Sequence, residues 1–169
     1  MTAGHSHTGP TARDAASRVH RRILVIGYGS PLRGDDRAGP RVAAVVARWP
    51  SHRVRAIAAH QLTPELAATL ATADLTIFID ADPRARAVRL CPLSPQASRA
   101  PAHSSDPRAI LALTATLYDR TPAAWLLSIP AADLTLGAPL SPTARSGCRH
   151  ALRHLRHILR CALRASRLS

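Results

Sequence analysis

Two adjacent carboxylates, Asp35 and Asp36, close the segment GYGSPLRGDD, which lies between an apolar run and a helical pattern. Acids at such a junction commonly cap the helix, because they accept hydrogen bonds from its free N–H groups and complement its dipole. Capping accounts for one aspartate better than for two, since neighbouring like charges cost free energy unless a cation or a donor separates them. The pair is therefore a candidate for chemistry as well as for capping.

A third carboxylate, Asp80, ends the apolar run in LTIFIDA. In open α/β sheets, ligand crevices form at the carboxyl ends of the strands. Asp36 follows the carboxyl end of the preceding buried strand, so we expect Asp36 and Asp80 to face one crevice. The other interpretation is that Asp80 caps the turn at Asp82-Pro83, and its position alone leaves both open.

The glycines beside these acids do not make a nucleotide fingerprint. Gly27 and Gly29 fit the first two positions of G-x-G-x-x-G, but the third position falls on Leu32. His60, not an acid, follows the second strand, so nothing is there to hold a ribose. No phosphate loop, Ser–His–Asp set or H-E-x-x-H helix is visible either. We expect no organic cofactor.

The elements that must position these residues follow from hydrophobic periodicity. Strands are predicted at Arg22–Tyr28, Val54–Ala59, Leu75–Ala81 and Ala124–Ile129, with a short extra strand at Val88–Leu93. Helices are predicted to begin near Gly39, at Thr63-Pro64-Glu65 with Thr63 as N-cap, at Asp106-Pro107 and at Ser141-Pro142. This alternation predicts a three-layer αβα fold, with a mostly parallel twisted sheet of about five strands and helices on both faces.

The length of 169 residues suits one domain around one core. Residues 1–20 are polar and without periodicity, so we predict a disordered tail there and a single α/β domain over 21–165. The three cysteines, Cys91, Cys148 and Cys161, lack the spacing of a metal finger and suit free thiols in a reducing cytosol. The longest apolar runs are far shorter than the roughly 20 residues of a membrane helix. We expect a cytoplasmic protein.

The chain is strongly basic, with a formal net charge of +13. Lys and Asn are absent, which fits an Arg- and Ala-rich, GC-biased coding background better than selection for a basic protein. The charge could attract nucleic acid, an acidic membrane or an acidic partner protein. Nucleic-acid sites usually add interleaved aromatic residues or a recognisable motif, and neither is present. We expect neither nucleic acid nor a membrane as partner.

The final helix carries an apolar stripe opposite a basic face. The stripe is Cys148, Leu152, Leu155 and Leu159, and the opposite face holds His150, His154 and His157 among Arg149, Arg153, Arg156 and Arg160. Three histidines at this spacing could bind a metal, but four neighbouring guanidinium groups would repel a cation. A solvated face is the favoured interpretation.

The segment GYGSPLRGDDRAGPRVA resembles the opening signature of the hydrogenase maturation proteases, a strand followed by G-N/S-P/x-L-x-x-D-D/E-x-x-G. The resemblance continues through HQLTPELAATLATADLTIFIDA, AILALTATLYDRTPAAWLLSIP and DLTLGAPLSP, and covers about residues 22–160. Two departures are Ser30, where Asn is commoner, and Asp36, where many members carry Glu.

This resemblance implies an aspartyl-type endopeptidase that removes the C-terminal peptide of a nickel-loaded NiFe-hydrogenase large-subunit precursor. Asp36, Asp80 and His103 would recognise the nickel, which the precursor itself presents, and the two aspartates would also be the catalytic residues. His60 is the alternative to His103. The precursor would be the partner of a monomeric enzyme. Asp35 would orient a ligand, act as the base or cap the helix.

Three other hypotheses stay open at this point. The chain could be a non-catalytic chaperone that binds the same nickel precursor, a basic nucleic-acid-binding module, or a degenerate member of the family. Salt-dependent DNA affinity would favour the nucleic-acid module. Cleavage of a precursor would separate a protease from a chaperone.

Overall fold

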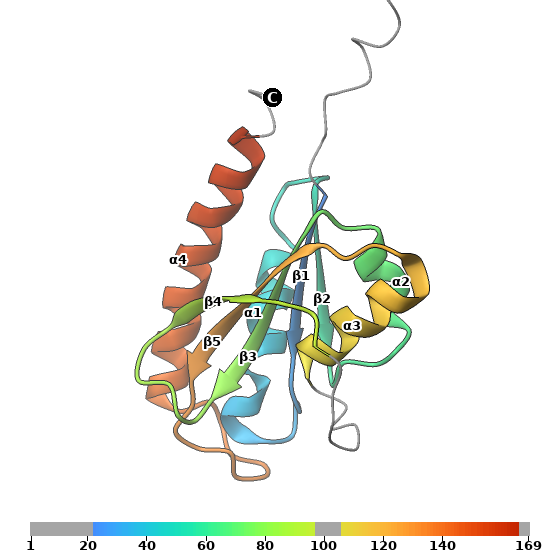
Figure 1. Cartoon of the computed structure of the whole chain (residues 1–169). Helices are drawn as coiled ribbons and strands as arrows, with labels where there is room; N and C mark the ends of the chain where they lie inside the picture. The colour runs from blue at the N-terminus through green and yellow to red at the C-terminus, as the bar shows by residue number, and fades with distance from the viewer. Residues whose placement is uncertain (1–21, 97–105, 166–169) are drawn as a thin grey trace, which may run out of the picture.

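A computed structural model of the chain describes residues 22–96 and 106–165 (Figure 1). The predicted tail at 1–20 and His103 therefore lie outside the described residues. The strands are β1 (Ile23–Tyr28), β2 (Val54–Ala59), β3 (Leu75–Asp82), β4 (Arg89–Leu93) and β5 (Ala123–Pro130). The helices are the short 3-10 helix η1 (Gly34–Arg37), α1 (Ala38–Val46), α2 (Leu66–Ala71), α3 (Pro107–Tyr118) and α4 (Pro142–Ala165).

The strands form one sheet in the order β2-β1-β3-β5-β4. β1 pairs in parallel with both β2 and β3, and β3 pairs in parallel with β5. Only β4, at the edge, runs antiparallel to its neighbour. The prediction of a mostly parallel five-stranded sheet, with an extra strand near residues 88–93, is confirmed.

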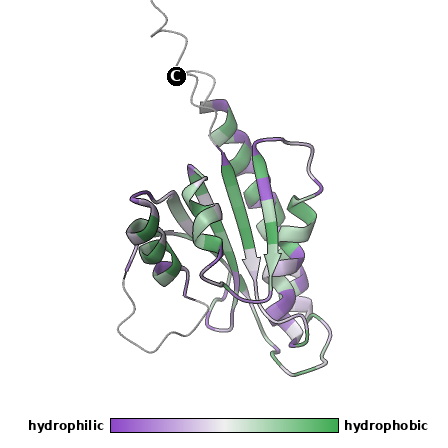
Figure 2. Ribbon diagram, turned by 90° about the vertical axis from the view of Figure 1, so that its right-hand side faces the viewer, coloured by the Kyte–Doolittle hydropathy of each residue, from purple (hydrophilic) through white to green (hydrophobic). Residues whose placement is uncertain are grey.

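Helices cover both faces of the sheet, as Figures 1 and 2 show from two directions. α1 and α4 pack on one face, and α2 and α3 pack together on the other. Each face has its own apolar cluster, and alternate residues of β1 supply both: Ile23 and Val25 on the α1–α4 side, Leu24 and Ile26 on the other. All six residues of β1 are buried, so the continuous apolar run reflects burial on both faces.

Three of the four predicted helix starts are confirmed and one is wrong. The helix predicted to begin near Gly39 is α1, which begins at Ala38. Asp106 caps α3, since its side chain accepts from the Arg108 amide at 2.8 Å. The Ser141 hydroxyl likewise accepts from Ala144 N at 3.1 Å, just before α4. Thr63 is not the N-cap of α2, which begins only at Leu66. A turn precedes that helix, in which the Thr63 carbonyl accepts from Leu66 N at 3.0 Å.

The basic face of α4 is solvated, as predicted. Cys148, Leu155 and Leu159 are buried against the sheet, whereas the seven His and Arg residues predicted to lie opposite them are exposed. Cys91, Cys148 and Cys161 are all free thiols. Within residues 22–96 and 106–165, no helix is both long and apolar enough to cross a lipid bilayer.

Candidate functional site

The site lies where the sheet reverses its strand order. The chain leaves β1 for β2 on one side and returns to β3 on the other, so the carboxyl ends of β1 and β3 open into a crevice between the two connections. Ligands bind at such points in doubly wound sheets. Asp36 comes shortly after β1 and Asp80 lies near the end of β3.

Glycines let α1 approach this edge closely. A Cβ on Gly27 would lie 2.0 Å from the Gly39 carbonyl oxygen, and a Cβ on Gly39 would lie 2.5 Å from that of Ile79. Neither distance is tolerable for a real side chain, so both positions require glycine. Gly27 and Gly29, the two glycines that matched part of the nucleotide fingerprint, therefore have a packing role. Gly27 lets α1 lie against β1, and Gly29, at φ +141°, lets the backbone of Asp36 lie close to it.

The Asp36 carboxylate is fixed by the loop that precedes it. Its Oδ2 accepts from Ser30 N at 2.7 Å. No side-chain bond of Asp36 or Asp35 caps η1 or α1, so the predicted capping by hydrogen bonds is wrong. Both acids do lie in the first turn of η1, where their charges complement the helix dipole as predicted. Asp36 is instead a half-buried carboxylate with one oxygen held by the loop.

Asp80 is fixed by a tyrosine of the neighbouring strand. The hydroxyl of Tyr28 donates to Asp80 Oδ2 at 3.0 Å. Burial raises the pKa of the Asp80 carboxyl to about 6. The bonds from Tyr28 and the Ala81 backbone oppose that rise, while the charges of Asp36 and Asp82 add to it. Burial, followed by the charge of Asp80, also raises the pKa of the Tyr28 phenol far above its ordinary range.

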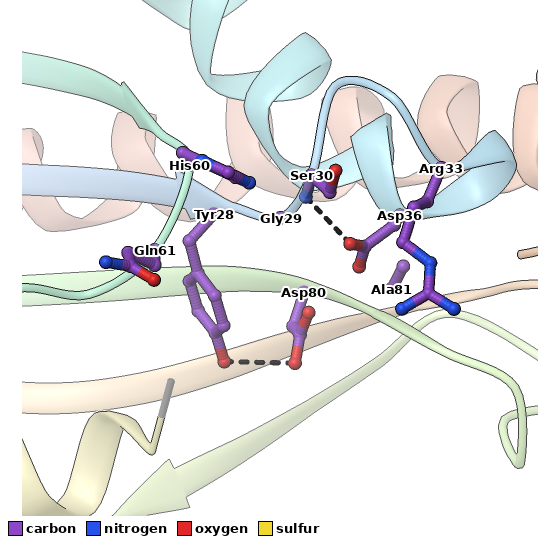
Figure 3. Close-up of a pocket in the computed structure, with 9 residues that line it drawn as sticks. All are labelled: Tyr28, Gly29, Ser30, Arg33, Asp36, His60, Gln61, Asp80 and Ala81. Atoms are coloured by element: carbon purple, nitrogen blue, oxygen red, sulfur yellow. Dashed lines mark hydrogen bonds between the residues drawn. The ribbon is translucent and has the colours of Figure 1, made fainter. Parts of the chain in front are cut away.

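Both carboxylates line one pocket of about 440 Å³. Its wall is mostly polar and consists of Tyr28, Gly29, Ser30, Arg33, Asp36, His60, Gln61, Asp80 and Ala81. Figure 3 shows the two aspartates in the middle of this row, with His60 and Gln61 toward one end and Arg33 toward the other. The expectation that Asp36 and Asp80 face one crevice is confirmed.

Asp35 points away from this pocket and is fully buried. Its carboxylate accepts from the amides of Ala132 (2.7 Å), Asp133 (3.0 Å) and Ser141 (2.7 Å), and from the Ser141 hydroxyl at 2.7 Å. Burial alone would raise the pKa of Asp35, but these bonds outweigh burial and lower it. Asp35 thus joins η1 to the segment before α4, and its predicted role as base or ligand-orienting group is not supported by this position.

The two candidate histidines differ in whether the structure describes them. His60 lines the pocket, whereas His103 lies outside the described residues. Over 22–96 and 106–165, no three His, Cys, Asp or Glu side chains are grouped so that they could hold a metal ion. Asp36, Asp80 and His60 therefore do not form a ready-made three-ligand site, and the stripe of histidines on α4 does not form one either.

Neither Tyr28 nor Arg33 was predicted to be a site residue. Both had a usable signal, because they are polar side chains at the carboxyl end of a buried strand or in the loop that follows it. Chemically, the pocket offers two carboxylates, one of them with a raised pKa, between a guanidinium and an imidazole. Such a set can bind a cation, or accept a proton from a water molecule beside a bound peptide.

No protein-family model and no curated protein matches the sequence. Solved structures do match the fold. One is the NiFe-hydrogenase maturation protease HycI of Thermococcus kodakarensis, with 16% identity and a TM-score of 0.68 over 89% of this chain and 99% of that one. Another is the hydrogenase maturating endopeptidase HybD of E. coli, with 20% identity and a TM-score of 0.69 over 83% and 93%.

A third match is the hydrogenase 2 maturation peptidase of a Thaumarchaeota archaeon, with 20% identity and a TM-score of 0.59 over 82% of this chain and 98% of that one. The matches span nearly the whole length of each relative, so this chain reproduces almost all of the fold of these peptidases. At such identities the likeness establishes the fold, and the activity is a separate question.

Proposed function

We propose that this chain is a hydrogenase maturation endopeptidase, which removes a C-terminal peptide from a nickel-loaded NiFe-hydrogenase large-subunit precursor. The observation that carries the proposal is the meeting of Asp36 and Asp80 in one polar pocket at the carboxyl edge of the sheet. The fold is that of solved maturation peptidases, and the opening motif of the chain resembles theirs. The action on a precursor is proposed by analogy with those proteins.

Asp36 and Asp80 would recognise the nickel of the precursor. Each carboxylate already has one oxygen held, by Ser30 N and by the Tyr28 hydroxyl, so neither side chain needs to be ordered when the substrate binds. Two carboxylates leave positions open on a divalent ion that arrives with its own protein ligands. A third contact would come from His103 or from His60 in the pocket wall.

The hydrolytic step needs an attacking water and a group that takes its proton. With a pKa of about 6, Asp80 is ionised at neutral pH, yet it is more basic than an ordinary aspartate. In the proposed step, the water oxygen bonds to the scissile carbonyl carbon and its proton passes to Asp80. The C–N bond then breaks, and the departing amine takes that proton.

The test is to incubate the purified protein with nickel-loaded and with metal-free precursor and to measure the mass of the products. A protease that reads the nickel shortens the loaded precursor and leaves the metal-free one intact. Binding of the loaded precursor without any shortening would replace the proposal with the non-catalytic chaperone. Equal cleavage of the nickel-loaded and the metal-free precursor would show that the protease does not recognise the nickel.

A further inference from the structure

The side chain of Arg33 lines the pocket, and no interaction within the described residues uses it. Its side chain is exposed and makes no hydrogen bond or ion pair with any residue in 22–96 or 106–165. The other arginine of this segment is different, since Arg37 donates to the carbonyls of Gly34 (3.1 Å) and Ala138 (3.0 Å). Figure 3 shows the Arg33 guanidinium at the Asp36 end of the pocket, away from His60. A guanidinium group with unused hydrogen-bond donors thus lies beside the two carboxylates.

Leu136 is paired with Arg33 across an isolated antiparallel bridge. Residues directly opposite in such a bridge project to the same face, so Leu136 shares the face on which Arg33 reaches the pocket. Its side chain is 72% exposed, the largest fraction among the exposed large apolar residues of the described segments. A single exposed leucine is ordinary on a protein surface. Leu136 differs from an ordinary exposed leucine because it is paired with a residue of the pocket wall, which places it beside the pocket.

The backbone that carries this pair is held rigidly. Beside the bridge, Gly137 N donates to the Leu32 carbonyl at 2.7 Å, and Asp35 N donates to that of Asp133 at 2.7 Å. The buried Asp35 carboxylate adds four further bonds between the same two segments. The backbone positions of Arg33 and Leu136 are therefore fixed relative to each other before anything binds, so a contact made by both needs only their side chains to be ordered.

We infer that Arg33 and Leu136 together bind the substrate chain beside the bond to be cut, an inference that rests on the proposed function. Arg33 donates to an oxygen acceptor of that chain, and Leu136 packs on an apolar side chain of the same short segment. The acceptor is a main-chain carbonyl or an acidic side chain, which offer a guanidinium the same chemistry. This makes the pair a determinant of substrate affinity, while the two aspartates act on the bond itself.

The test is the steady-state cleavage of nickel-loaded precursor by the wild type, Arg33→Met and Leu136→Ser. Each variant should raise KM about tenfold and leave kcat within about twofold, because an interaction common to ground and transition states is lost. Arg48→Met and Leu117→Ser are matched controls, since both residues are exposed and lie outside the pocket wall; they should keep the wild-type KM. Unchanged KM in both test variants would overturn the inference.

Two additional measurements complete the test. Precursors whose acidic residues near the cleavage point are replaced by serine identify the acceptor: if Arg33→Met no longer raises KM with them, the acceptor is a side chain, and otherwise it is the main chain. If the wild type cleaves nothing, the proposed function fails. The inference then stands or falls on binding of the loaded precursor, which the two test variants must weaken about tenfold relative to the controls.

Discussion

The phenol of Tyr28, at the end of β1, donates a 3.0 Å hydrogen bond to the Asp80 carboxylate on the neighbouring strand β3. The bond spans the point at which the strand order reverses, and it fixes the orientation of a half-buried acid in the pocket wall. Since burial raises the pKa of that acid to about 6, the free protein carries a carboxylate whose ionisation costs folding free energy.

Asp80→Asn should therefore stabilise the free protein at neutral pH. The pKa of Asp80 is higher in the folded chain than its ordinary value of 3.8. The folded state thus binds the proton more tightly, and its advantage is lost as pH rises from about 4 through about 6. Urea unfolding should give a gain of about 1–3 kcal/mol at pH 7.5 that shrinks toward pH 4.5. An equal effect at both pH values would contradict the raised pKa.

Asp35→Ala should destabilise the fold much more than Asp36→Ala. The first substitution leaves three backbone amides and a hydroxyl without their buried acceptor, and the second removes one bond at a half-buried site. We expect a loss of about 3–5 kcal/mol for Asp35→Ala and less than about 1 kcal/mol for Asp36→Ala. Urea unfolding of the two variants measures both. Similar losses would contradict the division of the pair into a structural and a pocket residue.

The basic face of α4 should contribute little to stability. Arg153→Gln with Arg160→Gln should change the free energy of unfolding by within about 0.5 kcal/mol, because both side chains are exposed. Arg156→Gln should cost somewhat more, about 0.5–1 kcal/mol, since its guanidinium lies 5.2 Å from the centre of the Trp49 ring. Complete loss of precursor cleavage at low salt in the double variant would instead assign this face to the active site.

The purified protein should fold without a metal of its own. Closed structural sites usually use four protein ligands, and the described residues contain no group of even three. Dialysis against chelator should leave the melting temperature unchanged, and added Ni²⁺ should raise it only slightly. One tightly held ion per chain, with unfolding on its removal, would turn the account toward a resident metal centre.

The meeting of Asp36 and Asp80 could be predicted because it depends only on parallel pairing. Both acids follow buried apolar runs, and the carboxyl ends of parallel strands share one edge. The different fates of the Asp35 and Asp36 side chains could not be predicted. The two side chains have different environments because Asp35 accepts hydrogen bonds from amides about a hundred positions later in the chain. No local sequence pattern predicts such a long-range contact.

The start of α2 shows a second limit. Thr63-Pro64 is a good opening for a helix, but a turn closed by the Thr63 and Pro64 carbonyls takes its place, and the helix begins at Leu66. Local propensity predicts the region in which a helix starts, but the first residue of the helix also depends on packing. His103 and the tail at 1–20 remain predictions, since both lie outside the described residues.

The central claim is that Asp36 and Asp80 act on a nickel-loaded precursor, and the most direct measurement is its cleavage rate with each aspartate replaced by alanine. Both variants should keep the wild-type circular dichroism spectrum and cleave at least about a hundredfold more slowly. Asp74→Ala is the control, because Asp74 lies just before the amino end of β3, away from the pocket, in an ion pair with Arg120. This variant should cleave at the wild-type rate. Cleavage at the wild-type rate by either Asp36→Ala or Asp80→Ala would contradict the account.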